Sequence, residues 1–351
     1  MPLISVIIPM YNAEATISRC VDSIFSKLST EEKNQLEVLL IDDGSTDNTF
    51  AICKEIATNN PQVSLYKKEN GGVSSARNFG ITKASSKWLC FIDCDDWLSS
   101  DGAKTLLEQA SFIQTDLLIY TIKFYYGKSS ISVQGISEFS LSTTEYLNQL
   151  PKVQGGEICL CSVCNKLYKA AVIKENQLSF YDISYGEDFS FNLEYLKYIN
   201  SVSSINQGIY IYDCTTQNSG VKRYRENFDV MLQYMNEKLN ALIEHYRLEH
   251  TKTEEFLMRF LSSCWLYATE VCFHSKLSIK EKKQCLMLWY NNAPKDILEM
   301  VEKTQHEPSV IINSYLKNKS LYWVILLLQV KYQWKKTRTN VYSFFNGGDF
   351  E

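Results

Sequence analysis

The sequence lacks the positive charge and the glycine-rich motifs that several classes of nucleotide-binding protein require. Its 351 residues carry 36 Lys and Arg against 40 Asp and Glu, a net charge of −4, which disfavours a general nucleic-acid binder. Neither G-x-G-x-x-G nor G-x-x-x-x-G-K-[S/T] occurs, so no dinucleotide-binding turn and no P-loop is expected. The most apolar run, residues 321–330, is about half as long as a bilayer span.

Histidine is scarce, with four in the chain, and the cysteines number 11, an odd count. No signal-peptide pattern follows Met1, so we expect reduced cysteines in a cytoplasmic protein. Cys159, Cys161 and Cys164 are clustered, but structural zinc needs four ligands and every histidine lies far downstream. A zinc site and packing on an apolar face are both possible interpretations, and we favour packing.

Short apolar runs alternate with amphipathic stretches over the first hundred residues. The runs are typical of strands buried on both faces, and the intervals show the spacing of helices. A strand–helix alternation of this length predicts a parallel sheet in an α/β fold. The expected strands are 3–8, 36–41, 63–66 and 88–92, and the expected helices are 17–28, 47–56 and 73–84.

Polar residues follow each of these four strands, at 9–12, 42–45, 69–72 and 93–96. Ligands of parallel sheets bind outside the carboxyl ends of the strands. A crevice rich in Asp repels a diphosphate unless a divalent cation lies between them. The Asp93-x-Asp95 pair is also compatible with an acidic helix cap, but four polar loops on one edge favour a metal-bridged nucleotide.

Four ordered motifs resemble those of glycosyltransferase family 2. They are Ser5-Val6-Ile7-Ile8-Pro9-Met10-Tyr11-Asn12, Ile41-Asp42-Asp43-Gly44-Ser45-x-Asp47, Asn70-Gly71-Gly72-x-x-x-Ala76-Arg77-Asn78 and Asp93-x-Asp95-Asp96. The resemblance implies the GT-A fold, a mostly parallel sheet flanked by helices. It also implies a UDP-sugar donor, a divalent Mn²⁺ or Mg²⁺ ion and inversion at the anomeric carbon.

The same resemblance assigns roles on the donor side. Pro9 and Tyr11 would border the uracil, and Asp43 would accept a hydrogen bond from its ring N–H. Asp93 would lie near the ribose, and Asp95 would hold the metal ion against the diphosphate. The remaining nucleotide-sugar-binding positions of the family's pattern are Asn12, Asn70, Gly71, Arg77 and Cys94, the last through its backbone at most.

Two later segments, 164–169 and 185–191, are similar to the family's acceptor-side motifs. Glycosyl transfer needs a carboxylate that takes the proton from the attacking hydroxyl, and the family's pattern assigns this base to Asp188. Neighbouring helical residues point about 100° apart, so Glu187 is expected to orient the acceptor or the loop, and Lys166 is a further candidate for binding the acceptor. An acidic helix start favoured by the helix dipole is the alternative for Glu187 and Asp188.

The chain is long enough for about two domains. We expect a GT-A domain over 1–225, with a donor half 1–98 and an acceptor half 99–225, followed by a helical accessory domain over 226–351. Basic residues and tryptophans in 321–338 fit an interfacial helix on anionic lipid. A buried helix or a dimer interface fits the same segment, so peripheral attachment to the inner membrane face and homo-oligomerisation both stay open.

The residues between the two parts, 215–223, lack apolar periodicity. They fit a solvated linker or, by resemblance, a mobile loop in which Lys222 or Arg223 approaches the diphosphate.

The expected function is therefore an inverting, metal-dependent hexosyltransferase. Its donor is a UDP-sugar (glucose, galactose or an N-acetyl form), and its acceptor is a growing glycan, lipid-linked or protein-linked, of a bacterial polysaccharide, capsule or glycoprotein. Sugar-phosphate nucleotidyl transfer is disfavoured because no Gly-rich, Arg-containing loop follows the first strand. The remaining alternative is a non-catalytic nucleotide- or glycan-binding partner of another transferase.

Overall fold

A computed structural model describes residues 1–303 except 128–130, 154–155, 184, 216–223 and 249. The chain divides into two compact units. The first comprises residues 1–221 and 234–256, and the second comprises 222–233 and the chain from 257 onward. Both long helices α10 (Phe228–Tyr246) and α11 (Lys252–His274) therefore contribute to both units.

The first unit is built on a sheet whose strand order is β3-β2-β1-β4-β9-β6-β10-β5, with β7 paired to β6 and β8 to β10. The first four strands of this order run parallel to one another. This confirms the predicted parallel arrangement. These strands are β1 (Ile4–Met10), β2 (Leu36–Asp42), β3 (Val63–Lys67) and β4 (Trp88–Phe91).

Beyond β4 the sheet is mixed, because β9 is antiparallel to both β4 and β6 while β10 is parallel to β6. The short β5 pairs antiparallel with the far end of β10. The strands of this part are β5 (Trp97–Leu98), β6 (Leu117–Tyr125), β7 (Ile131–Gln134), β8 (Phe139–Ser142), β9 (Lys166–Lys169) and β10 (Ser201–Asp213).

Every residue of β1 is buried, as expected for a strand with parallel neighbours on both sides. Its register pairs Met10 with Asp42 on β2 and Ile7 with Phe91 on β4. β1, β2 and β3 end at the same level, because Asp42 also pairs with Lys67 at the end of β3. β4 ends three residues earlier, opposite Ile7, and the polar loops after these strands lie at one edge of the sheet.

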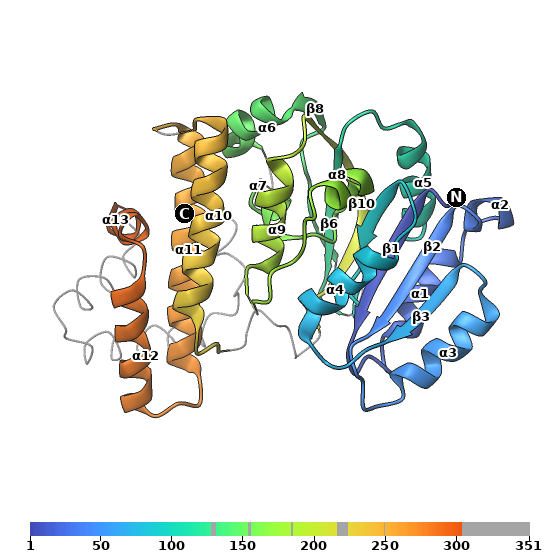
Figure 1. Ribbon diagram of the computed structural model, residues 1–351, viewed down its shortest axis with the longest axis horizontal. Helices are drawn as coiled ribbons and strands as arrows, with labels where there is room; N and C mark the ends of the chain where they lie inside the picture. The colour runs from blue at the N-terminus through green and yellow to red at the C-terminus, as the bar shows by residue number, and fades with distance from the viewer. Residues whose placement is uncertain (128–130, 154–155, 184, 216–223, 249, 304–351) are drawn as a thin grey trace. The chain divides into compact units, whose positions relative to one another are not determined.

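Helices cover both faces of the sheet (Figure 1). The predicted helix face is confirmed in α1, which buries Ile17, Cys20, Val21, Ile24 and Phe25. The helix α4 packs on β1 and β2, and the contact is close, because a Cβ on Gly80 would overlap the Ile7 side chain. The helices of this part are α1 (Ile17–Phe25), α2 (Thr30–Lys33), α3 (Thr49–Asn59), α4 (Gly72–Lys83) and α5 (Gly102–Phe112).

Further along the chain, α9 (Glu187–Leu196) follows Gly186, whose φ of +80° is a left-handed conformation that glycine adopts without strain. This turn places Glu187 and Asp188 in the first turn of the helix. The other elements here are α6 (Thr143–Gln149), a 3₁₀ turn (Leu150–Lys152), α7 (Gly156–Cys161) and α8 (Ala170–Glu175).

The described part of the second unit is helical. It contains α12 (Ile279–Asn292), α13 (Lys295–Lys303) and portions of α10 and α11. The Trp289 indole is buried there and donates to the carbonyl of Glu226 at 2.9 Å. None of the helices in the described ranges combines the length and the apolar character that crossing a membrane requires. The segment 321–338 lies outside the described residues, as do Lys222 and Arg223.

Candidate active site

The carboxylate of Asp43 binds the loop that leads into α4. Its Oδ1 accepts from Lys68 Nζ at 2.6 Å and from the Gly71 N–H at 3.0 Å, and its Oδ2 accepts from the Gly72 N–H at 2.7 Å. Asp43 is buried, whereas Asn70 and Gly71 are exposed. Two motifs of the sequence thus form one structure, in which the end of β2 holds the N-terminus of α4.

The loop after β1 is joined to the loop after β2. Asn12 has a left-handed φ of +51°, which Asn tolerates better than most residues. Its Oδ1 accepts from the Thr46 N–H at 2.9 Å, while its own N–H donates to Ser45 Oγ at 3.0 Å. Pro9 is buried within β1, but Tyr11 leaves 50% of its surface exposed at the strand's end. An aromatic face is therefore open to solvent beside this edge.

The acidic segment after β4 places its carboxylates in different environments. Burial and, next, the charge of Asp93 raise the pKa of Asp95 to about 6. Asp96 is buried, receives hydrogen bonds from the Tyr210 hydroxyl and the Asp213 N–H, and has a pKa raised chiefly by burial. Burial likewise raises the pKa of the Cys94 thiol. Asp96 thus supports the loop, and Cys94 offers no reactive thiolate.

Arg19 and Asp213 also meet at this loop, and the sequence reasoning missed both. Arg19 Nη2 donates to the Asp95 carbonyl at 2.7 Å and pairs with Asp213 Oδ2 at 2.9 Å, and its guanidinium lies 3.9 Å from the Trp97 ring. Asp213 is the last residue of β10, as Asp42 is the last residue of β2. Its position at the end of a strand could therefore have identified it from the sequence. Arg19 stands on the solvent face of a helix and carried no such signal.

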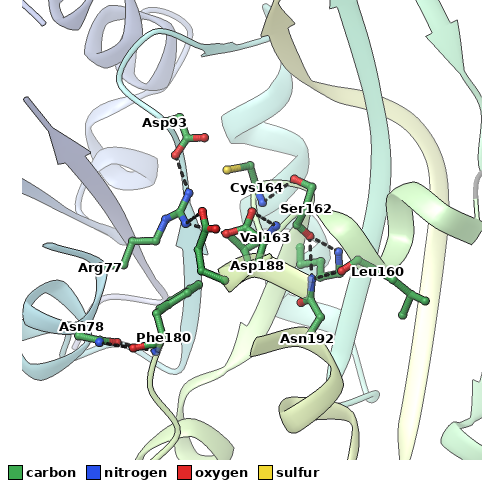
Figure 2. Close-up of polar contacts among 12 residues, drawn as sticks. Arg77, Asn78, Asp93, Leu160, Ser162, Val163, Cys164, Phe180, Asp188 and Asn192 are labelled. Atoms are coloured by element: carbon green, nitrogen blue, oxygen red, sulfur yellow. Dashed lines mark hydrogen bonds and ion pairs between the residues drawn. The ribbon is translucent and has the colours of Figure 1, made fainter. Parts of the chain in front are cut away.

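Arg77 joins the donor-side and acceptor-side motifs. Its side chain is 3% exposed, and its guanidinium pairs with Asp188 Oδ1 at 2.6 Å and with Asp93 Oδ1 at 2.9 Å. Figure 2 shows the guanidinium between these two carboxylates, and it lies 5.2 Å from the centre of the Phe180 ring. A buried cation is retained only when anions compensate its lost hydration. The cluster therefore fixes α4, the loop after β4 and the start of α9 around one charge.

The two acidic residues of α9 reach the same cation. Glu187 Oε1 lies 3.7 Å from Arg77 Nη1, the nitrogen that Asp188 contacts at 2.6 Å. Burial, and then the charge of Asp188, raises the pKa of Glu187 to about 7. Burial also raises the pKa of Asp188, although Arg77 opposes this. Their divergence of about 100° along the helix does not separate them here, because both side chains bend toward one guanidinium.

Lys166 is buried rather than exposed at a surface. Its side chain is 1% exposed, and its Nζ donates to the Ser162 carbonyl and, at 2.7 Å, to Asn165 Oδ1. Burial lowers the pKa of its ammonium to about 8. The amide of Val163, in the same segment, donates to Asp188 Oδ2 at 3.2 Å.

Within the described ranges, no group of three or more His, Cys, Asp and Glu side chains is placed to hold a metal ion by itself. Cys159 and Cys164 are buried, and burial raises the pKa of both thiols. A different kind of metal site fits the edge of the sheet. Mg²⁺ is commonly held by one or two carboxylates with waters and substrate phosphates, and Asp95 offers such a carboxylate with no Lys or Arg of the described residues paired to it.

Comparisons with known proteins agree with this geometry. A model of Glycosyl transferase family 2 matches residues 5–176. EpsJ of Bacillus subtilis, described as an uncharacterized glycosyltransferase, is 30% identical over 253 residues, which are 71% of this chain and 72% of EpsJ. Residues 1–349 of Staphylococcus aureus TarS, solved with UDP-GlcNAc, superpose with a TM-score of 0.67 at 19% identity, over 94% of this chain and 92% of that one.

A mannosyltransferase of Pyrobaculum calidifontis, solved with GDP-Man and Mn²⁺, gives a TM-score of 0.51 at 14% identity. It covers 95% of this chain and is itself covered to 88%. These superpositions show that the chain has the GT-A architecture. The chain belongs to glycosyltransferase family 2, as its four motifs predict.

Proposed function

We propose that this glycosyltransferase moves a hexose or N-acetylhexosamine from a UDP-sugar to a growing glycan, with inversion and with Asp188 as the general base. The main support is the Arg77 cluster, in which donor-side Asp93 and acceptor-side Asp188 both pair with one guanidinium. A donor bound at the polar edge of the sheet and an acceptor hydroxyl near Asp188 would then be neighbours. The TarS structures with UDP and UDP-GlcNAc support uridine as the nucleoside of the donor.

In the proposed reaction the Asp188 carboxylate accepts the proton of the acceptor hydroxyl as that oxygen attacks the anomeric carbon. The bond from that carbon to the diphosphate breaks, and UDP leaves. Burial makes the carboxylate a stronger base. Arg77 and the Val163 N–H hold its two oxygens in place, at 2.6 and 3.2 Å, so one reacting group is already oriented before the acceptor arrives.

On the donor side, Tyr11 and Pro9 would border the uracil and Asp93 the ribose. Asp43 would accept from the uracil N–H while still holding the loop at 70–72. Asp95 would bind Mn²⁺ or Mg²⁺, which supplies charge neutralisation on the leaving diphosphate. Its raised pKa fits this role, because a half-buried carboxylate without a paired Lys or Arg among the described residues gains stability from a bound cation.

The test is release of nucleotide from a panel of UDP- and GDP-sugars, with Mn²⁺, with Mg²⁺ and with a chelator. The proposal predicts metal-dependent UDP release from one donor and none from GDP-sugars. Asp95→Asn should weaken metal-supported UDP binding at least tenfold, because it removes a ligand's charge. The exposed Asp101→Asn is the matched control.

Equal UDP affinity in wild type and Asp95→Asn would refute the metal assignment. Metal-dependent UDP binding without turnover on any donor or glycan would instead favour the non-catalytic partner. Absence of binding to every nucleotide sugar would refute the proposed function as a whole.

A further inference from the structure

One peptide group links a buried lysine to the proposed base. The N–H of the Ser162–Val163 peptide donates to Asp188 Oδ2 at 3.2 Å. The carbonyl of the same peptide accepts from Lys166 Nζ and, at 3.1 Å, from Asn192 Nδ2. Figure 2 shows Ser162 and Val163 between Asp188 and Asn192. A cation and a carboxylate therefore contact opposite ends of one amide.

Helix α9 holds this peptide at both ends. Asp188 and Asn192 are four residues apart, so they lie on the same face of the helix one turn apart. Asn192 is fixed in turn, because its Oδ1 accepts from the Tyr168 hydroxyl at 2.6 Å and its Nδ2 also donates to the Leu160 carbonyl at 2.7 Å. Helix α9 thus sets the orientation of the peptide. The charge of Lys166 can then affect how strongly the amide is polarised.

Lys166 is costly for the fold, because it is 1% exposed and no carboxylate of the described residues lies within ion-pair distance of it. A buried charge without a counter-ion is rare unless it has a function. The pKa of about 8 means that the ammonium keeps its charge at neutral pH. Its Nζ is held by the Ser162 carbonyl and by Asn165 Oδ1.

We propose that Lys166 is a positioning residue for Asp188 and acts through the Ser162–Val163 peptide. A cation on the carbonyl polarises the amide and strengthens its N–H as a donor, as hydrogen-bonded chains do in a medium of low dielectric. The strengthened N–H holds the Asp188 carboxylate ionised and fixes the direction of its free lone pairs. This role rests on the proposed function, in which Asp188 is the base.

Several other groups act on the same carboxylate and set the background for any pH effect. The charges of Arg77 and Lys166 stabilise the anion, whereas burial and the neighbouring carboxylates of Asp93 and Glu187 disfavour it. The charged and titratable groups that face Asp188 are Arg77 on α4, Asp93 after β4, Glu187 on α9, and Cys164, Lys166 and Tyr168 in or beside β9.

The test is the pH dependence of kcat in Lys166→Met, measured from pH 5.5 to 8 with the donor that the sugar panel identifies. In wild type, kcat should fall at low pH as Asp188 becomes protonated, and we call this fall the acid limb. Without the cation the Asp188 anion is less stable, so the acid limb should move to higher pH by about half to one unit. At pH 6 the variant should then turn over roughly threefold to tenfold more slowly, while its UDP affinity stays within about twofold of wild type. An unmoved acid limb overturns the inference.

Two further variants keep the result decisive. Lys174→Met is the matched control, because this exposed lysine also donates to a backbone carbonyl, that of Ala84 at 2.6 Å, and its acid limb should equal that of wild type. If Lys166→Met fails to fold by circular dichroism, Lys166→Gln replaces it, since the amide can donate to Ser162 without charge. A wild-type limb in Lys166→Gln equally overturns the inference.

Asp188→Asn in the same assay separates this inference from the proposed function. Full activity in Asp188→Asn refutes Asp188 as the base and removes the ground for both proposals. Lost activity in Asp188→Asn with an unmoved limb in the Lys166 variants leaves the base in place and refutes the role of Lys166 alone.

Discussion

Replacing Arg77 with Met removes the charge that holds three carboxylates together. The two close contacts, at 2.6 and 2.9 Å from a side chain that is 3% exposed, are charge-assisted bonds worth ~1.5–3 kcal/mol each. Breaking a buried ion network by removing one partner costs ~3–5 kcal/mol. We therefore expect Arg77→Met to lower the free energy of unfolding by about 3–5 kcal/mol at pH 7.5.

The loss of unfolding free energy in Arg77→Met should be smaller at acid pH. A loss caused only by poorer packing would not depend on pH in this way. Without Arg77 the pKa values of Asp188 and Glu187 rise, so the folded variant binds protons that the unfolded chain does not. Its stability therefore falls as pH rises from 5 to 7.5, and the difference from wild type should be smaller at pH 5.

Urea unfolding followed by tryptophan fluorescence at both pH values measures these differences. Arg19→Met is the matched control, because Arg19 also pairs with an Asp, at 2.9 Å, but its side chain is 42% exposed. Such an exposed pair is worth about 1 kcal/mol or less. A loss below about 1 kcal/mol in Arg77→Met, or equal losses at pH 5 and 7.5, would refute the reasoning.

Three further predictions concern other contacts. Gly80→Ala should destabilise the fold by about 1–3 kcal/mol in urea, because its Cβ would overlap Ile7; wild-type stability would contradict this packing. The pKa of Glu187 is raised to about 7, so the free energy of unfolding of the wild-type protein falls as pH rises from 4.5 to 7. Glu187→Gln should thus gain ~1–3 kcal/mol on wild type between pH 5 and 8, and a constant difference would contradict it. Asp43→Ala frees the loop amides and should weaken UDP binding about tenfold by calorimetry; equal affinity would contradict its role.

The hydrophobic periodicity of the sequence and the polar residues that follow each apolar run were enough to predict the donor half of the sheet. Continuous apolar runs and the polar residues after them place Asp43 and Asp93 at one edge, because parallel strands end together. The register confirms this for the ends of β1 and β2, with Met10 opposite Asp42. Local rules suffice there, since each loop directly follows its own strand.

The Arg77 cluster could not be predicted in this way. Arg77 and Asp188 are 111 residues apart, and their contact depends on how α9 is placed relative to α4, which packs on β1 and β2 in the parallel part of the sheet. Lys166 illustrates the same limit, since a lysine in a polar motif is usually solvated and its burial follows from the position of β9 between β4 and β6. Long-range packing decides both.

The central claim is that Asp188 takes the proton from the attacking hydroxyl, while the UDP-sugar donor is held by other residues. The most direct measurement compares UDP affinity by calorimetry with the rate of UDP release in wild type and Asp188→Asn, at saturating Mn²⁺ and donor. The account predicts at least a hundredfold loss of kcat, the scale of a lost general base, with UDP affinity kept within about twofold. Turnover near the wild-type rate in Asp188→Asn would contradict it.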